Sequence, residues 1–198
     1  MVMISTPSRV RREANARRSM PNALQDWIAK DLAAGRSATW RFVAFHHPAL
    51  QSSRTHFNDQ WMSTLSPILE AGNVDVVFSG HVHNYQRSYP MTFLPRPHAD
   101  GRLVGPKGEV DGEWKIDKGS GNGAITQPKG VIYILSGGGG AGLYNPEQQT
   151  DPSTWQPFTH KYTADQHSFT IVDMDGKTFR LKQVAEDGTE VDAFTIAK

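Results

Sequence analysis

Hydrophobic and polar residues follow two periods along this chain, and the helical period comes first. Residues 21–35 (PNALQDWIAKDLAAG) carry apolar side chains every three to four positions, which predicts an amphipathic helix. The residues on its apolar face are Leu24, Trp27, Ile28 and Leu32. Asn22 suits the N-cap because Gln25 follows three residues later, and Gly35 suits the end of the helix.

A second helical pattern covers residues 56–72, where apolar side chains recur every four positions. These side chains are Phe57, Trp61, Leu65 and Leu69. Pro67 lies inside the pattern and should kink or split the helix, because proline has no N–H to donate.

Short apolar runs predict three buried strands, since they are rich in β-branched and aromatic residues. They are residues 40–45 (WRFVAF), 74–80 (VDVVFSG) and 131–140 (VIYILSGGGG). Residues 91–130, rich in Gly, Pro and charge, predict a long excursion with little regular structure.

The end of the chain changes to a period of two, which is typical of strands with one buried face. Three such segments follow one another: HSFTIVDM, KTFRLKQV and EVDAFTIA. Asp175-Gly176 and Asp187-Gly188 lie between them and favour hairpin turns. The pattern therefore predicts an α/β fold in which strand–helix–strand precedes a C-terminal antiparallel meander.

Composition limits the classes of function. The 198 residues suffice for one domain, and 21 Lys plus Arg against 20 Asp plus Glu give no case for nucleic acid or an anionic membrane as partner. The chain shows neither the apolar segment of a signal peptide nor a membrane span, which leaves its location open. With no cysteine, any metal must be held by His, carboxylate, amide, Tyr or backbone oxygen.

The first residues are the most basic part of the chain. Five arginines lie there, opposed only by Glu13: Arg9, Arg11, Arg12, Arg17 and Arg18. They suit a basic arm or targeting peptide, or simply a frayed, solvated terminus. We interpret residues 1–21 as a basic, disordered arm that precedes one domain over residues 22–198.

Histidines follow two of the predicted strands. His46 and His47 end the first strand, whereas His81 and His83 follow the second. Ligands gather beyond the carboxyl ends of parallel strands, so the two clusters would meet if these strands are parallel neighbours. Imidazole is a good ligand for zinc, iron and similar ions, which makes a metal site the main hypothesis.

His81 and His83 could share a site if the chain bends at Val82, which Gly80 permits. A lone His-x-His also arises by chance. The metallo-β-lactamase pattern requires Asp-His next, but Asn-Tyr follows here, so we set that class aside.

Three segments resemble the later motifs of calcineurin-like metallophosphoesterases: FHHP at 45–48, VDVVFSGHVHNYQRSYP at 74–90 and YILSGGGGAG at 133–142. The purple acid phosphatase branch is the most similar, because it carries Gly-His-x-His-x-Tyr-x-Arg. The resemblance covers residues 22–198. It implies the later half of the family's α/β sandwich, in proteins that are often secreted or periplasmic.

The resemblance also implies a function and roles for individual residues. The function is metal-dependent hydrolysis of phosphoesters by a dinuclear centre of Fe, Zn or Mn. Metal ligands would be His46, His81 and His83. His56 would contact the phosphate and protonate the leaving group, and His47 would lie on the substrate side.

The family's earlier motifs, Asp-x-His, Gly-Asp-x-x-Asp/Tyr and Gly-Asn-His, do not precede His46 in this chain. We therefore expect weak single-metal binding and little catalysis by the chain alone. A non-catalytic remnant or metal-binding module is the alternative. A half sheet would also expose an edge and an apolar face, which predicts self-association or a partner there.

The glycine run SGGGGAG at 136–142 allows two interpretations. It lacks the Lys-Ser/Thr of a P-loop, and no helical pattern follows it. We interpret it as a close-packed turn beside the metal site. The substrate and the identity of the metal stay open.

Overall fold

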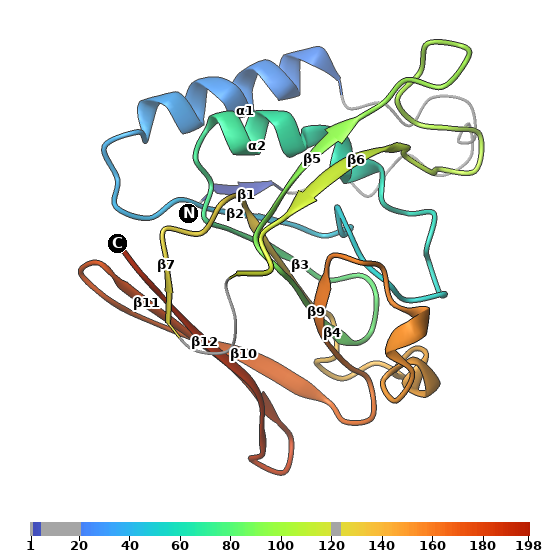
Figure 1. Cartoon of the computed structure of the whole chain (residues 1–198), viewed down its shortest axis with the longest axis vertical. Coiled ribbons are helices and arrows are strands. Elements are labelled where there is room, and N and C mark those ends of the chain that lie inside the picture. The colour runs from blue at the N-terminus through green and yellow to red at the C-terminus, as the bar shows by residue number, and fades with distance from the viewer. Residues whose placement is uncertain (1, 5–20, 120–123) are drawn as a thin grey trace.

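The computed structural model describes residues 2–4, 21–119 and 124–198 and arranges them in three layers (Figure 1). Two helices cover one face of a six-stranded sheet, and a four-stranded sheet packs against the other face. A two-stranded hairpin lies beside the helices. The predicted α/β class is confirmed.

The six-stranded sheet holds the predicted buried strands at its centre. Its order is β1 (Val2–Ile4), β2 (Phe42–Phe45), β3 (Val76–Ser79), β8 (Ile132–Ser136), β4 (Tyr85–Ser88) and β9 (Thr159–Thr163). The first four strands are parallel to one another, whereas β4 is antiparallel to both of its neighbours. The three predicted apolar runs become β2, β3 and β8, and their parallel pairing brings their carboxyl ends to one edge.

The helical layer consists of α1 (Asn22–Ala34), a 3-10 turn at Trp61–Leu65 and α2 (Ser66–Ala71). Ile28 and Leu32 are buried as predicted, but Trp27 is 48% exposed and lies outside the apolar face. The N-cap is Pro21 and not Asn22, because Pro21 already has the extended ψ of 136° that starts a helix. The predicted helix over 56–72 is wrong in its first turn, and Pro67 instead opens α2, where no N–H is needed.

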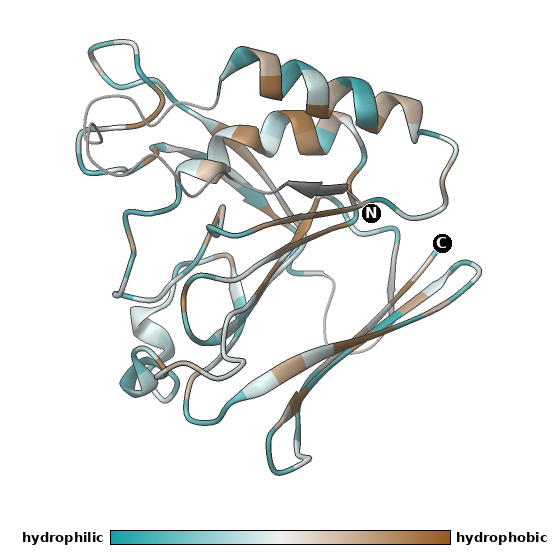
Figure 2. Ribbon diagram, turned by 180° about the vertical axis from the view of Figure 1, so that it is seen from behind, coloured by the Kyte–Doolittle hydropathy of each residue, from teal (hydrophilic) through white to brown (hydrophobic). Residues whose placement is uncertain are grey.

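Hydropathy is highest along the strands and on one side of the helices (Figure 2). None of the helices in the described ranges has the length and apolar character that crossing a membrane requires.

The second sheet has the order β10 (Ser168–Asp175), β11 (Thr178–Ala185), β12 (Glu190–Ala197) and β7 (Ala124–Thr126). The predicted antiparallel meander is confirmed, and both turn glycines, Gly176 and Gly188, have positive φ angles. Its inner face packs on the first sheet through one buried cluster: Val76, Tyr85, Ile132, Ile134, Phe179, Leu181, Phe194 and Ile196.

A buried ion pair also joins the two sheets. Arg87 in β4 donates from Nε and Nη2 to the two carboxylate oxygens of Asp192 in β12, at 2.7 and 2.9 Å. Tyr85 donates its hydroxyl to the same carboxylate at 2.7 Å. Only 3% of the Arg87 side chain and 7% of the Asp192 side chain are exposed.

The excursion over residues 91–130 contains more structure than predicted. β5 (Met91–Pro95) and β6 (Gly112–Ile116) form a hairpin, and β7 joins the second sheet. The prediction failed because β5 is fixed by tertiary contacts: Met91 and Phe93 are buried in the helix-side core, and Phe93 N donates to Glu70 at 2.6 Å. Strands β4 and β9 were not anticipated either.

Residues 2–4 form strand β1 and therefore do not belong to the predicted disordered arm. Val2 pairs in parallel register with Val43 of β2. The short apolar stretch Val-Met-Ile suits a strand beside a buried neighbour. Residues 1 and 5–20, with the arginine cluster, lie outside the described residues.

One apolar face of strand β10 is not covered. Thr170 Oγ1 lies 2.9 Å from Ser136 Oγ of β8, so the even-numbered residues of β10 face the first sheet. Val172 and Met174 share that face, yet they are 39% and 53% exposed. The neighbour of Val172 across the ladder, Leu181, is only 1% exposed. Within the described residues, the sandwich therefore ends before this apolar face is buried.

Candidate metal centre

The two histidine clusters meet at one edge of the six-stranded sheet. β2 ends at Phe45 and runs into His46 and His47, while the parallel strand β3 ends at Ser79, shortly before His81. His46 Nε2 lies 3.2 Å from His81 Nδ1. The rings of His47 and His81 have centroids 4.2 Å apart. The convergence predicted from the strand ends is thus present in the structure.

His56 reaches the same place from the loop that follows β2. Its ring centroid is 4.4 Å from that of His81. Its Nδ1 lies 3.0 Å from Asp59 Oδ2, and the same carboxylate oxygen lies 3.5 Å from His81 Nε2. Sequence reasoning missed Asp59. The spacing His-x-x-Asp in a turn was the available signal, because residues three apart in a turn are neighbours in space.

The backbone is left-handed at two of these histidines. His56 has φ 59° and His81 has φ 66°. The predicted bend at Val82 is therefore displaced to His81 itself, and Gly80 is not among the positive-φ glycines. A residue other than glycine held in this region costs about 1–3 kcal/mol, and such residues cluster at functional sites.

His83 is linked to the rest of the cluster through Tyr144, whose ring centroid lies 5.7 Å from that of His56. Its ring stacks on Tyr144 with centroids 4.2 Å apart, and its Nδ1 lies 2.9 Å from the carbonyl oxygen of Gly142. Because a carbonyl oxygen only accepts, Nδ1 carries the proton and Nε2 keeps a lone pair. This arrangement is common for a metal-binding histidine. The predicted ligand role of His83 stays a prediction.

The glycine run packs closely against the His81–His83 segment. A Cβ added at Gly137 would collide with the backbone oxygen of Val82, so only glycine fits there. Gly137 N also donates to Asn84 O at 2.9 Å. The interpretation of a close-packed turn beside the histidines is therefore confirmed at Gly137, whereas Gly139, Gly140 and Gly142 have open space around them.

Side-chain amides hold the loop that carries His56. Asn145 Oδ1 accepts from Ser53 Oγ at 2.6 Å and from Thr55 N at 2.9 Å. Gln148 Oε1 accepts from Arg54 N at 2.9 Å. Both amides belong to a segment about 90 residues further along the chain, so the position of His56 depends on tertiary structure.

Burial lowers the pKa of His81, and the neighbouring His56 and His46 lower it further, while Asp59 opposes the shift. His81 is therefore neutral at neutral pH. The neutral imidazole is the form that binds a metal ion.

Among the described His, Asp and Glu residues, one group of three has donor atoms close enough for a shared ion. His56, Asp59 and His81 place these atoms within 4.8 Å of one another. His46 adjoins this group through His81. The structure thus joins three of the predicted site residues to a carboxylate that the prediction lacked.

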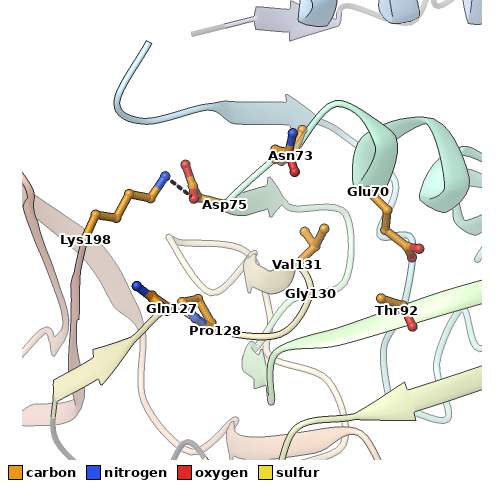
Figure 3. Close-up of a pocket in the computed structure, with 10 residues that line it drawn as sticks. Glu70, Asn73, Asp75, Thr92, Gln127, Pro128, Gly130, Val131 and Lys198 are labelled. Carbon is orange, nitrogen blue, oxygen red and sulfur yellow. Dashed lines mark ion pairs between the residues drawn. The ribbon is translucent and has the colours of Figure 1, made fainter. Parts of the chain in front are cut away.

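A pocket elsewhere in the fold contains none of the predicted site residues (Figure 3). Asp75, which immediately precedes β3, pairs with Lys198 Nζ at 2.5 Å on one side of it. Glu70 lies on the other side, and burial raises the pKa of its carboxyl group, while a hydrogen bond from Phe93 N opposes this. Because His81 follows the opposite end of β3, this pocket is separate from the histidine cluster.

Comparison with known proteins supports the predicted family. Residues 5–85 match the family model described as calcineurin-like phosphoesterase. Purple acid phosphatase 18 of Arabidopsis thaliana is 41% identical over 66 residues, which are 31% of this chain and 15% of that protein. Probable inactive purple acid phosphatase 1 of the same plant is 26% identical over 137 residues, which are 68% of this chain and 18% of that protein.

The fold matches the structure of the purple acid phosphatase PPD1 from yellow lupin seeds, with a TM-score of 0.59 at 21% identity. The match covers 91% of this chain and 29% of that chain. Residues 5–85 thus match the class of calcineurin-like phosphoesterases in sequence, and the fold resembles that of a purple acid phosphatase. Within that class, the chain is a homologue of the purple acid phosphatases over part of its length.

Proposed function

We propose that this chain supplies the histidine-rich half of a centre that hydrolyses phosphoesters with the help of metal ions. The observation that carries the proposal is the convergence of three imidazoles on His81. The ring centroids of His46, His47 and His56 lie 5.0, 4.2 and 4.4 Å from that of His81. Similarity to purple acid phosphatases supplies the reaction type and the class of substrate.

In this proposal, His46, His81 and His83 hold Fe, Zn or Mn ions. When bound, such ions neutralise charge on the phosphoryl oxygens and polarise the P–O bonds. His56 delivers a proton to the leaving oxygen, and His47, whose ring lies beside that of His81, contacts the substrate.

The direct test is hydrolysis of p-nitrophenyl phosphate by the purified 198-residue chain with added Zn²⁺, Mn²⁺ or iron. We expect slow turnover that a chelator removes, because the family's earlier ligand motifs are absent from this chain. His81→Ala should lose at least about 100-fold of the metal-dependent rate, since it removes a ligand. Turnover that does not depend on metal would contradict the proposal.

A non-catalytic metal-binding module is the second candidate. It is favoured because the described donor group contains a single carboxylate, Asp59, whereas two divalent cations require more negative charge. Of the two Arabidopsis relatives named above, the one that matches the larger share of this chain is described as probably inactive. Hydrolysis separates the candidates: turnover that a chelator removes supports the enzyme, and metal binding without turnover supports the module.

We also propose that the uncovered face of β10 mediates self-association. Val172→Asp with Met174→Asp should weaken association by about tenfold or more, because two carboxylates would lose water at the contact. Ala193→Asp is the matched control, since it adds charge to an exposed position on the same sheet. Light scattering after size exclusion measures the result. A monomeric wild-type chain at high concentration would contradict the proposal.

A further inference from the structure

We propose that Asp59, together with His56 and His81, forms a site for one zinc-type divalent ion that this chain holds by itself. This inference deepens the proposed function and rests on its metal dependence. It differs in one respect: His56 acts as a ligand here, in place of the proton donor that the resemblance implies.

The first support is distance. Asp59 Oδ2 lies 3.0 Å from His56 Nδ1 and 3.5 Å from His81 Nε2. Ligand atoms around a tetrahedral zinc ion lie about 3.3 Å from one another, since each is about 2.0–2.1 Å from the metal. Small side-chain rotations would therefore bring all three groups onto one ion.

The second support is a buried nitrogen without a hydrogen bond. His81 Nε2 is buried and makes no well-formed hydrogen bond within the described part of the chain, since Asp59 Oδ2 is 3.5 Å away. Such a group is unfavourable when nothing compensates for its lost hydrogen bonds to water. A cation between this nitrogen and the nearby Asp59 carboxylate would satisfy it.

The third support is the local backbone. Asp59 N donates to His56 O at 2.9 Å, which closes a turn and places the imidazole and the carboxylate on the same side. His56 and His81 both have left-handed φ angles, and their ring centroids are 4.4 Å apart. The backbone thus adopts two unfavourable conformations where the donor atoms meet.

The donor set also fits the chemistry of the ion. Two imidazoles and one carboxylate are the ligands of open zinc sites, which keep a further position for water or substrate. One carboxylate leaves a divalent ion with a net positive charge. An anion such as phosphate would be attracted to that open position.

The experiment is titration of the 198-residue chain with Zn²⁺ against a chelating indicator. We expect one ion per chain and a loss of at least about 100-fold in affinity for Asp59→Asn, which keeps the shape but removes the charge. Asp59→Glu should restore part of the affinity. Asp173→Asn is the matched control, because it makes the same change at an exposed carboxylate that pairs with Arg180 in the second sheet. Circular dichroism checks that each variant is folded.

A second readout uses Co²⁺ in place of Zn²⁺, because its visible spectrum reports the coordinating atoms. The wild-type spectrum should change on addition of inorganic phosphate, and Asp59→Asn should lose the spectrum. Unchanged affinity in Asp59→Asn, or no ion bound by the wild type, overturns the inference. One ion that depends on Asp59 without any hydrolysis supports the inference and refutes the proposed enzyme.

Discussion

Asp192→Asn is expected to lower the free energy of unfolding by about 3–5 kcal/mol, which is a large part of the stability of a domain of this size. The substitution leaves the Arg87 guanidinium buried without a counter-charge, since only 3% of that side chain is exposed. It also weakens the hydrogen bond that Tyr85 donates to the carboxylate. Urea denaturation followed by circular dichroism measures the change.

The matched control is the exposed pair of Arg180 and Asp173 on the same sheet, whose side chains are 47% and 71% exposed. Asp173→Asn should change stability by no more than about 0.5 kcal/mol. The double variant Arg87→Met/Asp192→Leu should be more stable than Asp192→Asn alone, because it leaves no unpaired buried charge. An equal loss of stability in Asp192→Asn and Asp173→Asn would contradict this explanation.

The same ion pair predicts the behaviour of the protein in acid. Burial alone would raise the pKa of Asp192, but hydrogen bonding and attraction to Arg87 outweigh it and lower the pKa. The folded state therefore binds this proton less readily than the unfolded state. The Asp192 carboxylate therefore contributes its full share to the free energy of unfolding above the ordinary aspartate pKa of about 4. This stabilisation is lost as the pH falls below that value. Asp192→Asn should make stability less dependent on pH in that range.

The sequence could predict those strands whose hydrophobic pattern lies within a short stretch of the chain. β2, β3 and β8 were visible as apolar runs, and the meander was visible from its period of two and its Asp-Gly turns. The position of His46 and His81 at neighbouring strand ends followed from the same logic, because parallel strands share an edge.

The missed features depend on residues far apart in the chain. β4 carries polar side chains, and its place in the sheet is stabilised by Arg87, whose partner Asp192 is 105 residues away. The loop with His56 and Asp59 is held by amides about 90 residues further on. Neither pairing leaves a periodic signal. For the same reason, the sequence indicated three imidazoles and not the carboxylate beside them.

Substitution of His81 by glycine should separate function from stability more sharply than any other single change. His81 is the hub of the cluster, since its ring lies close to His46, His47 and His56 and its Nε2 faces Asp59. We expect His81→Gly to lose at least about 100-fold in Zn²⁺ affinity, together with any metal-dependent hydrolysis.

The stability of His81→Gly should equal that of the wild type or exceed it by up to about 1.5 kcal/mol. Glycine accepts the φ of 66° without strain, which regains about 1–2 kcal/mol, although its freedom in the unfolded chain takes back about 0.5–1 kcal/mol. Asn73→Gly, at φ 50° in the turn after α2, is the control and should alter stability alone. A residue that only packs would destabilise the fold when removed. An unfolded or strongly destabilised His81→Gly chain would therefore show that this ring serves the core, and the metal centre would lose its central ligand.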